Sequence, residues 1–131
     1  RRPPRSTLFP YTTLFRSNAV ITSAGNLQTR FVIHAVGPKW GEGHEVEKLR
    51  NAAIKSLQRA EEKKLKSIAF PAISTGIFGF PLKLAAETLL TAVWQYLSQK
   101  SEIETVTFIL FDIESFNVFK DQLTFLAKGK I

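Results

Sequence analysis

The sequence contains no cysteine and no methionine, and only two histidines among its 131 residues. Without cysteine there is no disulfide framework, no thiol nucleophile and no zinc–thiolate site. His34 and His44 have no second ligand at metal-binding spacing, so we predict no metal and no cofactor. No apolar run approaches the ~18 residues that a membrane span requires, and no signal peptide is recognisable. We therefore expect no membrane partner and a cytoplasmic location.

Acidic residues are in the minority, with 11 Asp and Glu against 18 Lys and Arg, which gives a net charge of +7. Four of the arginines lie in residues 1–17, RRPPRSTLFPYTTLFRS, a segment whose pattern does not continue into the rest of the chain. Its composition is compatible with a basic transit peptide or a nucleic-acid-binding arm. However, the whole segment back-translates without a mismatch into DNA that resembles a common short-read sequencing adapter.

We therefore treat residues 1–17 as a non-native, adapter-like segment that does not pack against the rest, and residues 18–131 as one domain. Subtracting the four arginines from the 18 basic residues leaves 14 against 11 acidic ones, a net charge of +3. A basic chain ordinarily suggests a nucleic-acid partner. Because most of the excess belongs to the adapter-like segment, the sequence argues against nucleic acid.

The most informative stretch is 70–81, which reads FPAISTGIFGFP. The apolar segment before it predicts a buried strand, and a helical pattern follows it. Gly76 and Gly79 allow a ligand to approach the backbone closely, and Ser74 and Thr75 add hydroxyl donors. Backbone amides ahead of a helix N-terminus favour anions. A simple surface turn is the alternative, but the connection exceeds the usual ~2–6 residues, which favours a phosphate-binding loop. No Gly-Lys-Ser/Thr follows, so it is not a P-loop.

Residues 70–79 resemble the diphosphate-binding loop of macro domains, the ADP-ribose-binding module. Two further segments agree in the expected order: VIHAVGP at 32–38 resembles the family's central strand and turn, and FILFD at 108–112 resembles its last core strand. The resemblance covers residues 18 to about 126. It implies that the loop holds a diphosphate, with Phe78 beside the distal ribose and Phe111 stacked on adenine. The ligand-binding residues implied are Ala72, Ser74, Thr75, Gly76, Ile77, Phe78, Gly79, Phe111 and Asp112.

Several of these single residues have a second interpretation. Phe111 can equally be a core residue at the sheet edge, and Asp112 can equally cap the helix that begins near Glu114. His34 lies in an apolar strand, where a hydrogen-bonded core histidine is more common than a catalytic base. Trp40 and Trp94 are interpreted as structural, and His44 as exposed.

Strand and helix patterns alternate along the rest of the chain. Strands are predicted at 19–22, 30–36, 67–70 and 105–111, and helices at about 45–64, 81–97 and 114–127. This order predicts an α/β fold of three layers, α/β/α, with a mixed, largely parallel sheet that lacks its first strands. Ligands bind such sheets beyond the carboxyl ends of the strands. The expected inward residues are Val46, Leu49, Ala53, Leu57 and Ala60, then Ala85, Leu89, Val93 and Leu97, then Phe116, Phe119, Leu123 and Leu126.

The resemblance also implies segments that the sequence does not contain. In the family, an Asn-Ala-Ala-Asn-type strand end, an aspartate that reads adenine and a glycine-rich loop lie upstream and complete the binding cleft. In members that hydrolyse ADP-ribosyl bonds, this upstream region supplies the residues credited with catalysis. We therefore expect the carboxyl-terminal part of a macro domain, inactive by itself, with catalytic residues unknown. The parent is expected to hydrolyse ADP-ribosyl bonds or to deacetylate O-acetyl-ADP-ribose; the alternative is a non-catalytic reader. The expected partner is ADP-ribose or an ADP-ribosylated protein.

Overall fold

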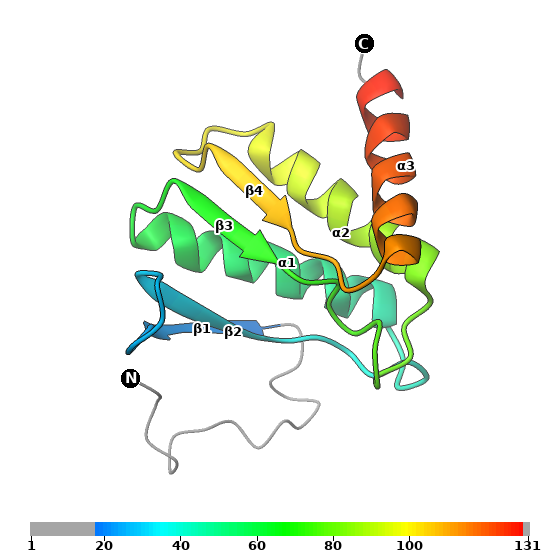
Figure 1. Cartoon of the computed structure of the whole chain (residues 1–131), viewed down its shortest axis with the longest axis horizontal. Helices are drawn as coiled ribbons and strands as arrows, with labels where there is room; N and C mark the ends of the chain where they lie inside the picture. Colours follow the sequence, from blue (N-terminus) through cyan, green and yellow to red (C-terminus); the bar gives the residue numbers. More distant parts are fainter. Residues whose placement is uncertain (1–17, 130–131) are drawn as a thin grey trace.

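The computed structural model describes residues 18–129 of the chain (Figure 1). Strands and helices alternate after an initial hairpin, as the sequence predicts. The described elements are β1 (Asn18–Ser23), β2 (Phe31–Val36), α1 (Glu45–Glu62), β3 (Ser67–Phe70), α2 (Leu82–Leu97), β4 (Thr105–Phe108) and α3 (Ile113–Gly129). The prediction that residues 1–17 do not pack against the rest of the chain concerns residues outside the described part.

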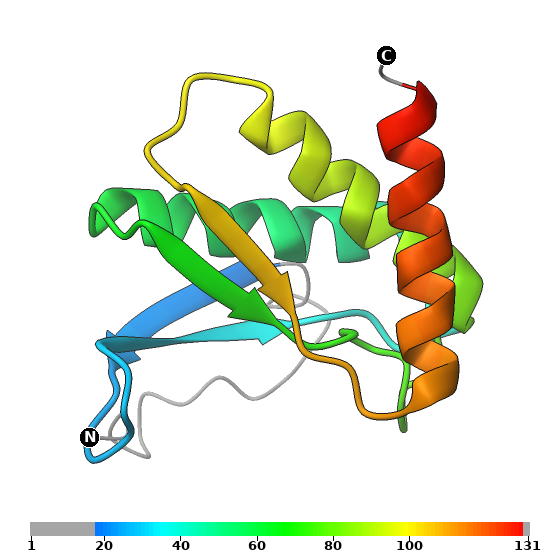
Figure 2. The same ribbon diagram turned by 45° about the horizontal axis from the view of Figure 1, so that its top comes forward.

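The four described strands form two separate ladders. β1 pairs antiparallel with β2, from Asn18 opposite Val36 to Ser23 opposite Phe31. β3 pairs parallel with β4, ending with Phe70 opposite Phe108. The arrowheads of β2, β3 and β4 lie at the same side of the molecule, and that of β1 lies at the other (Figure 2). The predicted α/β class with mixed strand directions is confirmed, but the pairing is divided between two ladders.

The helices bury their small and apolar stripes against each other and against the strands. Leu49 and Leu57 of α1 and Leu89 of α2 are fully buried, and Ser56, also buried, donates its hydroxyl to the carbonyl of Ala52. Three rings extend this core, with Phe108 stacked on Phe70 at 5.5 Å and tilted against Phe119 of α3 at 5.4 Å between ring centroids. Deleting one of these side chains would cost about 2–5 kcal/mol.

The opposite face of the β3–β4 ladder is exposed in the described part of the chain. Ser67, Ala69, Thr105 and Thr107 point away from the helices and alternate with the partly or fully buried residues of the same strands. No described helix covers these four residues, so the third layer that the sequence predicts is not seen over them. This alternation is typical of a sheet with one packed face.

The end of β4 and the exposure of three residues expected to be inward differ from the prediction. β4 ends at Phe108 rather than at Phe111, because its partner β3 ends where Pro71 supplies no N–H for a ladder. Phe116 and Leu123 of α3 were expected to be inward but are about half exposed, and so is Val46 in the first turn of α1. Phe116 and Leu123 border an open groove between α2 and α3. The apolar face of α3 that carries these two side chains is therefore only partly covered.

Candidate functional site

The central feature of the candidate site is the β3–α2 loop, residues 71–81, which leaves the carboxyl end of β3. Its shape is set by short hydrogen bonds within the loop. The hydroxyl and the N–H of Thr75 both donate to the carbonyl of Ala72, at 2.7 and 3.2 Å. The N–H of Gly79 donates to Gly76, and the N–H of Phe80 donates to Ser74. Ser74 and Gly79 adopt positive φ angles of 67° and 75°, which fold the loop back on itself.

These bonds leave a specific set of donors for a ligand. Within the part of the chain that the structure describes, the N–H groups of Ser74, Gly76 and Ile77 donate to no acceptor. We refer to these three donors as the cradle. Thr75 and Gly79, which also belong to the predicted diphosphate-binding loop, use their N–H groups within the loop and offer no backbone donor to a ligand. Ile77 is 98% exposed, so the loop presents its tip to solvent.

Helix α2 begins directly after the loop and adds a second source of positive potential. Pro81 is its N-cap, no side chain caps its first turn, and that turn contains no acidic residue. Uncapped N–H groups and the helix dipole both favour an anion at this position. The predicted start at Pro81 is shifted by one residue, since Leu82 is the first helical residue.

Residues that follow β2 hold the β3–α2 loop in place. The backbone N–H of Trp40 donates to the carbonyl of Phe78 at 2.8 Å, and the Trp40 ring meets buried Phe80 edge-on at 5.1 Å. Gly37 lies against the loop, where any side chain would collide with Ser74 and Ile73. Trp40 therefore has the structural role that the sequence predicts. The role of Gly37 was not predicted from the sequence, where the Gly-Pro pair indicates only that the strand stops.

The β4–α3 connection reaches the same edge of the molecule. The N–H of Ile109 donates to the carbonyl of Phe70 at 2.7 Å, so this connection starts beside the β3–α2 loop. Phe111 follows and is 98% exposed, which excludes the alternative of a core residue. Its ring is free to stack on a planar ligand.

Asp112 caps helix α3, which is one of the two roles predicted for it. Its Oδ1 accepts the N–H of Ser115 at 2.9 Å, and its carbonyl accepts the N–H of Phe116. The hydrogen bond from the Ser115 backbone holds the pKa of the Asp112 carboxyl below its usual range. The carboxylate is fully solvent-exposed, so capping does not remove it from reach of a ligand.

The two histidines are placed as expected. Nε2 of His34 lies 2.9 Å from the hydroxyl of Thr22 across the β1–β2 ladder, so His34 is a hydrogen-bonded strand residue. His44 is exposed and adopts a positive φ of 55° before α1. In the described residues no three His, Asp or Glu side chains gather where they could hold a metal ion, and no described helix is long and apolar enough to cross a membrane.

Comparison with known proteins agrees with this geometry. The family model described as "Macro domain" matches residues 15–89, more than half of the chain. The chain belongs to the macro domain family. The match starts inside the segment 1–17 that we separate as adapter-like, so the boundary at residue 18 stays a prediction.

Relatives and solved structures of macro domains cover most of this chain. It is 50% identical over 105 residues to a macro domain-containing protein of Listeria monocytogenes. This match covers 77% of this chain and 60% of the relative. It is 45% identical over 109 residues to the O-acetyl-ADP-ribose deacetylase of Enterobacter cloacae, covering 82% of this chain and 61% of that enzyme. This chain thus spans about 60% of the length of the curated relatives it matches.

The structures agree on the fold. The macro domain of Oceanobacillus iheyensis with ADP superposes with a TM-score of 0.84 at 34% identity, covering 87% of this chain and 60% of that one. The macro domain of Trypanosoma brucei in complex with ADP-ribose gives 0.73 at 27% identity, covering 79% and 44%. The predicted macro-domain architecture, lacking part of the fold, is confirmed.

Proposed function

We propose that the β3–α2 loop binds the diphosphate of ADP-ribose, free or attached to a protein. The observation that carries this proposal is the group of three N–H donors, at Ser74, Gly76 and Ile77, which have no acceptor among the described residues and precede an uncapped helix N-terminus. Converging amides at a helix start suit a phosphate group. Two solved macro domains with this fold are described as complexes with ADP and with ADP-ribose, which supports the same ligand class here.

The other candidate residues have distinct roles in this proposal. Ala72 and Thr75 form the turn that shapes the loop, and Gly79 provides the positive φ that returns the chain to α2. Phe78 is half-buried and anchored to Trp40 through its carbonyl, which suits a ring that packs beside a ribose. In this proposal the exposed ring of Phe111 stacks on the adenine, and Asp112 is its neighbour in the sequence.

The parent protein is proposed to be a hydrolase of ADP-ribosyl bonds or of O-acetyl-ADP-ribose. Relatives at 44–45% identity named O-acetyl-ADP-ribose deacetylase support this assignment. The alternative is a reader module that binds ADP-ribose without turnover, because the β3–α2 loop serves binding in both classes. Turnover of O-acetyl-ADP-ribose by the parent, with none by this chain, is expected for the hydrolase; binding without turnover by the parent would establish the reader.

Binding by the loop can be tested directly in the 131-residue chain. We expect millimolar ADP-ribose to shift the backbone amide signals of Ser74, Gly76 and Ile77 in NMR spectra, and adenosine, which has no phosphate, to leave them in place. Gly76 has neither a crowded Cβ position nor a positive φ, so Gly76→Glu is compatible with the loop but puts a negative charge in the cradle. Each charge-assisted hydrogen bond is worth ~1.5–3 kcal/mol, so affinity should fall at least about tenfold.

Gly129→Glu is the matched control, because Gly129 is also open and lies at the end of α3. It makes the same change in charge and volume away from the loop and should leave the affinity unchanged. Equal affinities for the Gly76→Glu and Gly129→Glu variants would exclude this loop as the phosphate site.

A further inference from the structure

The β2–α1 connection, residues 37–44, lies beside the β3–α2 loop at one end of the molecule (Figure 1). Trp40 joins the two segments, because its N–H donates to the carbonyl of Phe78 at 2.8 Å and its ring meets Phe80 edge-on. Phe78 directly follows Ile77, the last residue of the cradle. The position of Trp40 therefore bears on the shape of the part of the loop that carries the cradle.

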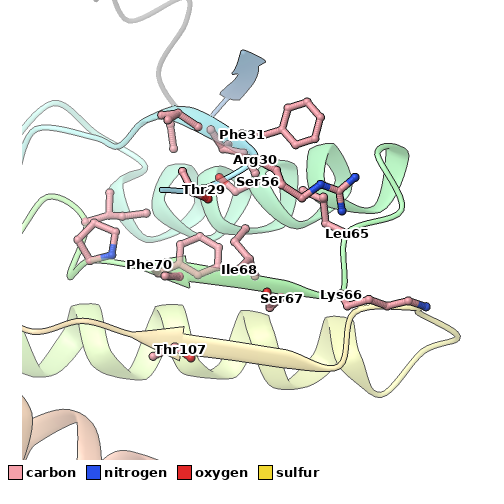
Figure 3. Close-up of a pocket in the computed structure, with 16 residues that line it drawn as sticks. Thr29, Arg30, Phe31, Ser56, Leu65, Lys66, Ser67, Ile68, Phe70 and Thr107 are labelled. Atoms are coloured by element: carbon pink, nitrogen blue, oxygen red, sulfur yellow. The ribbon is translucent and has the colours of Figure 1, made fainter. Parts of the chain in front are cut away.

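The start of the same loop has a different neighbour. Pro71 and Ile73 line a cavity of about 780 Å³ that occupies the gap between β2 and β3 (Figure 3). Trp40 is not among the residues that line this cavity, and its contacts are with the end of the loop. The end of the loop is thus held by contacts that do not involve the gap.

Trp40 enters a tight turn that Glu45 closes. Oε2 of Glu45, the first residue of α1, accepts the N–H of Gly41 at 2.7 Å and the N–H of Gly43 at 3.3 Å. The two glycines adopt positive φ angles of 98° and 99°, and both direct their N–H groups to this one oxygen. Converging backbone N–H groups of this kind suit an anion. In this turn the anion is a carboxylate of the chain itself.

The carboxylate of Glu45 is held in its charged form. Hydrogen bonds from its own N–H and from the N–H groups of Gly41 and Gly43 lower the pKa of Glu45 below its usual range, and the nearby Lys48 acts in the same direction. Lys48 also pairs with Glu42 of the same turn, with 3.0 Å between Nζ and Oε2. Two carboxylates therefore fasten the turn to the start of α1, and hydrogen bonds to a charged acceptor are the stronger kind.

The bonds of Glu45 and Phe78 fix Trp40 from both sides. The N–H of Trp40 is held by Phe78, and the peptide unit that follows Trp40 is held through the Gly41 N–H by Glu45. Because a peptide unit is planar and moves as one body, losing the Glu45 acceptor frees this unit to rotate and changes the position of Trp40.

We propose that Glu45 is a positioning residue for the β3–α2 loop: its carboxylate closes the turn, holds Trp40 against Phe78 and Phe80, and so keeps the cradle in the shape that binds a ligand. This inference rests on the diphosphate binding proposed above. Glu45 touches no ligand in this arrangement and acts only through Trp40.

The test compares two substitutions of Glu45 with a matched control. Glu45→Ala removes the acceptor, whereas Glu45→Gln keeps an oxygen for the same two N–H groups. Glu47→Ala is the control, because Glu47 is the other acidic residue in the first turn of α1 and is exposed. In NMR spectra without ligand, Glu45→Ala should shift the amide signals of Trp40, Gly79 and Phe80, Glu45→Gln should restore them, and Glu47→Ala should leave them unchanged. Loop signals that stay in place in Glu45→Ala, or shift equally in Glu47→Ala, would overturn the proposal.

Trp40 also provides an optical measurement. The chain has two tryptophans, so Trp94→Phe leaves Trp40 as its only one. The Trp40 side chain is 43% exposed, and its release from Phe80 in Glu45→Ala should expose it further and shift its emission to longer wavelength. The same shift should be absent from Glu45→Gln made in the Trp94→Phe background. Identical emission from the Ala and Gln variants would overturn the proposed hold on Trp40.

The affinity for ADP-ribose connects this hold to binding. Glu45→Ala should weaken binding about three- to tenfold, because the ligand must then order the loop itself, and Glu45→Gln should recover most of the loss. A loss in Glu47→Ala as large as that in Glu45→Ala would overturn the positioning role. If the original chain does not bind ADP-ribose, the proposed function fails, and the ligand-free spectra alone decide whether Glu45 holds the loop.

Discussion

Gly37 and Ser74 touch so closely that a Cβ atom at position 37 would overlap the hydroxyl oxygen of Ser74. Gly37 directly follows β2 and Ser74 lies within the β3–α2 loop, so this contact sets the distance between two connections that leave the strands at the same edge. Ser74 also has the positive φ of 67° that orients the free N–H groups of the loop. The proposed phosphate cradle therefore depends on a residue that lies far from it in the sequence.

Gly37→Ala should lower the free energy of unfolding by about 1–3 kcal/mol, the usual cost of overpacking a tight contact. Thermal or urea unfolding followed by circular dichroism measures this change. Gly76→Ala is the control, because its Cβ would meet no atom within 4 Å, and its stability should stay within about 0.5 kcal/mol of the original. Equal effects of the two substitutions would contradict the close contact at Gly37.

Asp112→Ala should lower the melting temperature at pH 7, because it removes the acceptor for the Ser115 N–H at the start of α3. Asp112→Asn should preserve most of the stability, since asparagine also caps helices. Asp121→Asn, an exposed substitution within the same helix, should have no effect. A melting temperature unchanged in Asp112→Ala would show that the cap contributes nothing.

The contribution of the Asp112 cap should also depend on pH. Its carboxyl has a pKa below the ordinary value of 3.8 in the folded chain, mainly because the Ser115 N–H donates to it. A depressed folded-state pKa means that the stabilisation is complete above 3.8 and is lost as the pH falls through the folded-state value. The difference in melting temperature between the original chain and Asp112→Ala should shrink over that acidic range. A difference that grew on acidification would reverse the sign and exclude this mechanism.

Much of the fold was predictable because its signals are local. Strand β3, the glycines and hydroxyls of the loop and the start of α2 are adjacent in the sequence, and each has its own chemical signature. The end of β4 was not predictable from its own residues, because it depends on where β3 stops at Pro71. For α3, the periodicity identified an apolar stripe but not which residues pack against it. The half exposure of Phe116 and Leu123 could therefore not be predicted. The gap between β2 and β3 arises from the placement of two ladders, which no local pattern encodes.

Phe111→Ala should weaken ADP-ribose binding while leaving the binding of inorganic pyrophosphate unchanged. The ring is 98% exposed, so its removal should not affect folding, and a stacked base contributes ~1–3 kcal/mol. Phe78→Ala should weaken ADP-ribose binding less than Gly76→Glu does, because Phe78 contacts only the ribose in the proposed arrangement. Titration of each variant with both ligands separates the two ends of the site. Equal losses for pyrophosphate and ADP-ribose in Phe111→Ala would contradict the assignment of Phe111 to the base.

The chain should associate through its uncovered apolar surfaces at high concentration. Phe125 of α3 is 70% exposed, and the strand edges that have no partner among the described residues add to this tendency. Phe125→Lys should reduce the light scattering of concentrated samples. Asn117→Lys adds the same charge on α3 without removing apolar surface, and should reduce it less. An equal reduction in both variants would attribute the association to charge alone.

Pro71 and Ile73 line the cavity between β2 and β3 and also form the first turn of the β3–α2 loop, where the Ile73 N–H donates to the Pro71 carbonyl. This turn is therefore a wall of the cavity and the first part of the loop at the same time. A change in its position would alter the shape of the cavity and the orientation of the loop donors together, because both are built on the same two residues.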